Sequence, residues 1–175
     1  MANKLQKYTV QEKLNKMDVD IIDITATLTG DGTSGDLMFD TTEIEKAVAV
    51  DAGSGILQSA VAVVSDNATD GSGTGANVTG GWKLVITSDS TSIGTISDDL
   101  ASDTSTRAVL DGICCIVNIS SVTDHGKYGV FSKENIGAVI KAAEDTRSLY
   151  AYGITNSAND YNGGTITLRL GIMRD

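Results

Sequence analysis

Apolar and polar side chains alternate with a period of two through much of this 175-residue chain, and the alternation leaves few folds open to it. In residues 163–175, the apolar members of the alternation are Ile166, Leu168, Leu170 and Ile172. Successive side chains of a β-strand point to opposite faces, so this run has one face for a core and one for water. Residues 22–28 repeat the pattern. We expect both segments to be half-buried strands, with residues 163–175 built into a sheet.

Further extended segments lie between clusters of Gly, Asn, Asp and Ser, which are turn-forming residues. One segment begins at residues 37–39, and the others span residues 44–50, 56–65, 82–87, 113–120, 136–143 and 149–155. One short helix is predicted over residues 102–112, which is too short for the crossover of a parallel sheet. The sequence therefore predicts an all-β fold, either an antiparallel β-sandwich or a jelly-roll-like barrel of about eight strands.

The charge is distributed unevenly along the chain. Residues 1–17 carry Lys4, Lys7, Lys13 and Lys16 against Glu12, a net charge of +3, which leaves −13 for the rest of a chain of net charge −10. Thr9 and Glu12 have the spacing of a capping box, which predicts a short helix over residues 10–16. A solvated terminus and a docking arm that orders on a partner fit these features equally well. We divide the chain into a basic N-terminal arm, 1–17, and a single β domain, 18–175.

The composition argues against several classes of partner. A net charge of −10 repels the nucleic-acid backbone, so direct nucleic-acid binding is not expected. Aromatic residues make up only 5% of the chain, which leaves few rings to stack on sugars or bases. No apolar run reaches membrane-spanning length and no leader pattern is present, so we expect no membrane association and synthesis in the cytoplasm.

Each candidate for chemistry lacks the context that its chemistry needs. The GSGTGA segment at 71–76 does not open a helix, as a dinucleotide-binding loop must. His125 is the only histidine and lies in a turn-like segment. Cys114 and Cys115 are adjacent, so a strand would place them on opposite faces, and we interpret them as apolar fillers without a disulfide. We expect no catalytic, cofactor-binding or metal-binding residues, and a protein that is not an enzyme.

Several of the strand segments resemble a known group of proteins. The segments are ENIGAVIKAA (134–143), SLYAYGIT (148–155), GGTITLRLGIMRD (163–175) and the earlier block 44–66. Together they cover about half of the chain and are similar to small structural proteins that tailed bacteriophages encode near their capsid genes. The resemblance implies a virion protein made in the bacterial host, and specifically a capsid decoration, or cement, protein on the outside of the assembled head.

The resemblance also implies partners. They are the major capsid protein and further copies of the chain itself, as a dimer or trimer. Because the arm is opposite in charge to the body, Lys4, Lys7, Lys13 and Lys16 are our candidates for contact with the capsid. Two alternatives stay open: a minor head–tail connector or tail structural protein, which copy number per virion would distinguish, and a carbohydrate-binding adhesin domain, which should expose aromatic side chains.

Overall fold

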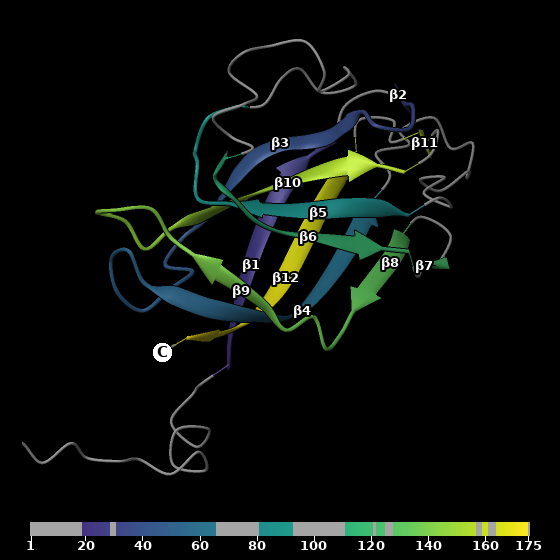
Figure 1. Cartoon of the computed structure of the whole chain (residues 1–175). Coiled ribbons are helices and arrows are strands. Elements are labelled where there is room, and N and C mark those ends of the chain that lie inside the picture. Colours follow the sequence, from purple (N-terminus) through teal and green to yellow (C-terminus); the bar gives the residue numbers. More distant parts are fainter. Residues whose placement is uncertain are drawn as a thin grey trace, which may run out of the picture.

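The chain folds into two antiparallel sheets, one of six strands and one of four, which pack as the layers of a β-sandwich (Figure 1). The strands of one layer run across those of the other. The computed structural model describes residues 19–28, 31–65, 81–92, 111–120, 122–124, 128–156, 159–160 and 164–174. The predicted arm helix and most of the predicted helix over 102–112 lie outside these residues. The all-β prediction is confirmed.

The larger sheet has the order β1-β12-β4-β8-β7, and β9 pairs with the first part of β4. Its strands are β1 (Val19–Thr27), β4 (Ser54–Ser65), β7 (Val122–Asp124), β8 (Tyr128–Lys133), β9 (Ala138–Lys141) and β12 (Thr165–Arg174). The smaller sheet has the order β3-β10-β5-β6. Its strands are β3 (Leu37–Ile44), β5 (Trp82–Thr87), β6 (Ile113–Ile119) and β10 (Leu149–Thr155). Two further short strands, β2 (Asp31–Gly32) and β11 (Asn159–Asp160), pair with each other.

The eight strands of six residues or more pair in a nested order. Numbered from one to eight along the chain, the first pairs with the eighth (β1 with β12), the second with the seventh (β3 with β10), the third with the sixth (β4 with β8) and the fourth with the fifth (β5 with β6). The chain is thus a long antiparallel ribbon, folded back on itself and wound into two layers.

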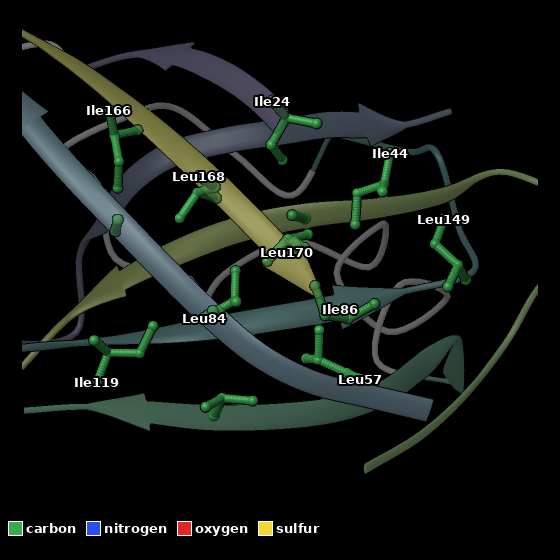
Figure 2. Packing of buried hydrophobic residues seen from close by; sticks show 14 of the residues in the cluster. Ile24, Ile44, Leu57, Leu84, Ile86, Ile119, Leu149, Ile166, Leu168 and Leu170 are labelled. Atoms are coloured by element: carbon green, nitrogen blue, oxygen red, sulfur yellow. The ribbon is translucent and has the colours of Figure 1, made fainter. Parts of the chain in front are cut away.

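Three aromatic rings form the centre of the core. The Trp82 ring meets those of Phe39 and Phe131 edge to face, with centroids 6.0 and 6.3 Å apart, and all three side chains are fully buried. Aliphatic side chains fill the remaining space between the layers. Those labelled in Figure 2 include Leu168 and Leu170 of β12 and Leu84 and Ile86 of β5. The four apolar positions of the 163–175 alternation are all buried, as predicted.

One predicted strand, 44–50, is wrong. Ile44 is the last residue of β3, and the chain then turns through Lys46 and Ala52, whose φ angles of 51° and 54° lie in the left-handed region that extended backbone excludes. Val48 is buried but Val50 is 63% exposed, so the two do not share one face. Conversely, β7 and β8 form where no strand was predicted.

Candidate functional site

The outward side of the six-stranded sheet is a broad surface made by the side chains that point away from the core. Strand register aligns its side chains in cross-strand rows. These rows are Ile21–Gly171–Ser59, Asp23–Arg169–Val61–Ser132, Thr25–Thr167–Val63–Val130 and Thr27–Thr165–Ser65–Tyr128. A further row, Val19–Met173–Ile56–Val139, continues the same side beyond the register shift that bends β4. We call the residues of these five rows the open face.

The open face carries most of the exposed large apolar side chains among the described residues. Six large apolar side chains are described as exposed, and four of them lie on this face: Val19, Ile21, Tyr128 and Val139, at 52, 58, 51 and 65% exposure. Three half-buried valines also belong to this face: Val61, Val63 and Val130. Single exposed apolar residues are ordinary, but several on one sheet face indicate a surface that contacts another molecule.

Only two residues of the open face are charged, and their charges cancel. The Arg169 guanidinium donates to both carboxylate oxygens of Asp23, at 2.9 and 3.0 Å. These hydrogen bonds, together with the positive charge of Arg169, hold the pKa of Asp23 below its usual value. On a chain of net charge −10, the open face is therefore a neutral area.

Four hydroxyl groups of the open face bond to one another in pairs across strands. Ser65 and Thr165 are 2.7 Å apart between hydroxyl oxygens, and Thr25 and Thr167 are 3.4 Å apart. These hydroxyl groups keep their hydrogen bonds when another molecule covers them and displaces water. The free energy of desolvation is therefore smaller than for hydroxyl groups without a partner.

A groove runs along the edge of β1 that faces away from β12. Its volume is about 460 Å³, and its walls are residues 21–25 of β1 and Thr42, Glu43, Glu45 and Lys46 at the end of β3. No described strand pairs with this edge of β1. Arg174 holds the two walls together, because its guanidinium forms an ion pair with Asp20 and donates to the Lys46 carbonyl at 2.5 Å.

The cysteines do not form a reactive site. Both are free, and both pack against the same core, because a register shift opposite Ile86 interrupts the alternation that predicted opposite faces. The Cys114 thiol donates to the Lys141 carbonyl at 3.3 Å. Burial raises the pKa of Cys115 to about 11, so this thiol stays protonated and weakly nucleophilic at neutral pH.

The candidate residues named from the sequence lie outside the described residues. They are Lys4, Lys7, Lys13, Lys16, His125 and the 71–76 loop. Within the described ranges, no cluster of three His, Cys, Asp or Glu side chains is placed to hold a metal ion, and no helix has the length and apolar character needed to cross a membrane.

The open face was missed in the sequence, although a signal was present. The outward positions of β1 and β12 are mostly threonine, isoleucine and valine, where an ordinary solvated strand face would carry Lys and Glu. The fold and this face define an all-β sandwich with one neutral, partly apolar sheet face. No family model matches the chain, and no curated protein matches it.

Proposed function

We propose that this protein is a capsid decoration protein of a tailed bacteriophage, bound to the outside of the assembled head. The observation that carries the proposal is the nested strand pairing. First with eighth, second with seventh, third with sixth and fourth with fifth is the order of a jelly roll, an architecture common in viral capsid and lectin domains. Fold alone supports many functions, so this is an argument by analogy.

Two other observations support the same proposal. The segments that resemble phage structural proteins correspond to β4, β9, β10 and β12, which include the centre of the six-stranded sheet. The open face supplies a neutral, partly apolar contact surface on a stiff body. A decoration protein needs both, a rigid body and a surface for its protein neighbours.

The proposed mechanism is stabilisation by mass action. A protein that binds the assembled shell, but not the separated coat subunits, shifts the equilibrium toward the shell by an amount set by its affinity and concentration. We place the major capsid protein and further copies of this chain as its partners, on the capsid surface. The arm lysines Lys4, Lys7, Lys13 and Lys16 are the proposed capsid contacts, since their charge of opposite sign distinguishes the arm from the acidic body and suits it to an acidic partner surface.

Copy number in purified virions tests this function. Quantitative gels and cryo-EM should find hundreds of copies in symmetric positions on the head. A dozen copies at one vertex would instead assign the protein to the connector or tail, and absence from the particle would favour the carbohydrate-binding alternative, because lectin domains share the jelly roll.

The arm is tested separately. Replacing the four arm lysines with glutamine should lower capsid occupancy, most strongly at low salt, where the attraction of the lysines to an acidic surface is least screened. The matched control replaces four exposed lysines of the body with glutamine and so changes the net charge by the same amount; they are Lys46, Lys83, Lys133 and Lys141. Equal occupancy of the arm variant and the control would refute the arm contact while leaving the virion assignment in place.

A further inference from the structure

We propose that the open face is the surface on which a second copy of this chain docks. The inference names the partner of the face and rests on the proposed function for the place where the copies act. The contact itself needs no capsid. It follows from the charge, the apolar surface and the size of the face.

The charge selects the partner. Two copies of a chain of net charge −10 repel each other, and the repulsion is smallest where neither presents net charge. The open face is such a place, because the charges of Asp23 and Arg169 cancel. A basic partner would be drawn to acidic surface instead, such as the groove wall that carries Glu43 and Glu45. A neutral face on an acidic body therefore fits a partner that is itself acidic, and a second copy is one.

The apolar side chains are distributed across the whole face. Ile21 lies on β1 at one edge of the sheet, whereas Tyr128 lies on β8, beyond β12 and β4 and at the other end of the rows. Both are more than half exposed. A strand added to the edge of β1 would cover Ile21 alone, while a partner lying flat on the sheet would cover both.

The face is large enough for a specific contact. Four strands spaced about 4.8 Å apart, with a rise of about 3.3 Å per residue over the length of β1, span roughly 20 by 30 Å. Two such faces would bury about 1,200 Å² in total, at the lower end of the range for specific interfaces. Such an area suits an oligomer that forms at high local concentration, as on a capsid, and dissociates on dilution.

The test is the solution mass of the full chain, by analytical ultracentrifugation over a wide concentration range, without capsids. Wild type should form an oligomer that dissociates on dilution. Ile21→Lys and Tyr128→Lys should each weaken association more than about tenfold, because each would bury an unpaired charge in the contact. Ile116→Lys is the control: Ile116 has the same 58% exposure as Ile21 but lies on β6, in the other sheet.

This design separates the contact from general electrostatics. All three lysine substitutions lower the net negative charge equally, so a general relief of repulsion would strengthen association in all of them. Raising the salt should strengthen wild-type association, since it screens the repulsion between acidic bodies. Thermal melting of each variant confirms that it is folded.

Several results would overturn the inference. The first is a wild type that stays monomeric at its highest soluble concentration. The second is an Ile116→Lys variant whose association is weakened as much as that of Ile21→Lys. The third is weaker association in Ile21→Lys but not in Tyr128→Lys, which would place the contact at the β1 edge. A monomeric wild type whose Ile21→Lys variant loses capsid occupancy would assign the face to the coat protein, and the proposed function would stand. An oligomer that depends on the face, in a protein absent from virions, would leave the inference standing and refute the proposed function.

Discussion

Replacing Gly153 with alanine should destabilise the protein through a single steric clash. A Cβ atom at this position would lie 2.7 Å from Cδ1 of Phe39 and closer still to Cε1, where ordinary carbon contacts begin near 3.4 Å. The Phe39 ring would have to move by about 1 Å, and it is fully buried against Trp82, which in turn meets Phe131. Overpacking of a core typically costs about 1–3 kcal/mol, and we expect about 3 kcal/mol because two more rings lie behind the first.

A double-mutant cycle isolates this clash. Urea unfolding, followed by the fluorescence of the single tryptophan, Trp82, gives the free energy of unfolding of wild type, Gly153→Ala, Phe39→Leu and the double variant. Leucine at position 39 lacks Cε1, the nearest ring atom, and its Cδ methyl groups can rotate away from the new methyl group. Gly153→Ala should then cost less than about 1 kcal/mol, a coupling of about 2 kcal/mol. An equal cost in both backgrounds, or a Gly153→Ala variant as stable as wild type, would refute the steric reasoning.

Three further perturbations follow from the core and from the titrating groups. Leu168→Ala should lower the free energy of unfolding by about 3 kcal/mol in the same urea assay, because Leu168 is buried at the centre of the six-stranded sheet. Arg169→Gln should remove a contribution of Asp23 that is present above the ordinary aspartate pKa of 3.8 and lost as the pH falls through its lowered folded value; the urea midpoints of wild type and variant should therefore converge on acidification. Cys115 holds its proton more tightly when folded, so wild-type stability should fall as the pH rises from 9 toward 11, and it should fall less in Cys115→Ala.

The strands that the sequence predicted best are those with one buried face. The alternation of residues 166–172 places every apolar side chain in the core, and Ile24 of β1 lies opposite Leu168 as the pattern requires. A sheet that separates core from solvent imposes this periodicity directly, so the residues alone disclose it. The described residues form twelve strands rather than about eight, and the two sets differ, because residues 44–50 do not form a strand and β8 was not predicted.

The prediction failed where tertiary contacts override the local pattern. Val48 and Val50 look like strand residues, but the left-handed turns at Lys46 and Ala52 set the path of the backbone there. In β5, Val85 lies between Leu84 and Ile86 on the side opposite theirs, yet it is also buried, in a second small cluster with Leu37 and Tyr152. Both effects involve distant segments: the amides of Val48 and Ala52 donate to carbonyls of residues 146–147, and the small cluster joins β3, β5 and β10.

The open face could not be predicted for a different reason. Its rows join residues far apart in the sequence, and Asp23 and Arg169 are separated by 146 positions, so no single segment reveals that their charges cancel. The threonines and valines on the outward positions of β1, β12 and β4 were visible in the sequence. Only the strand order gathers them on one surface.

The nested pairing also has a consequence for how the chain folds on the ribosome. The innermost pair, β5 with β6, can form early, but β1 emerges first and finds its described partner, β12, only when residues 165–174 have been made. Contacts this distant in sequence form slowly. Because β12 lies between β1 and β4, a chain cut short before it lacks the strand that joins them. Translation must therefore run through β12 before the six-stranded sheet can be complete, so truncated chains lack the larger layer of the sandwich.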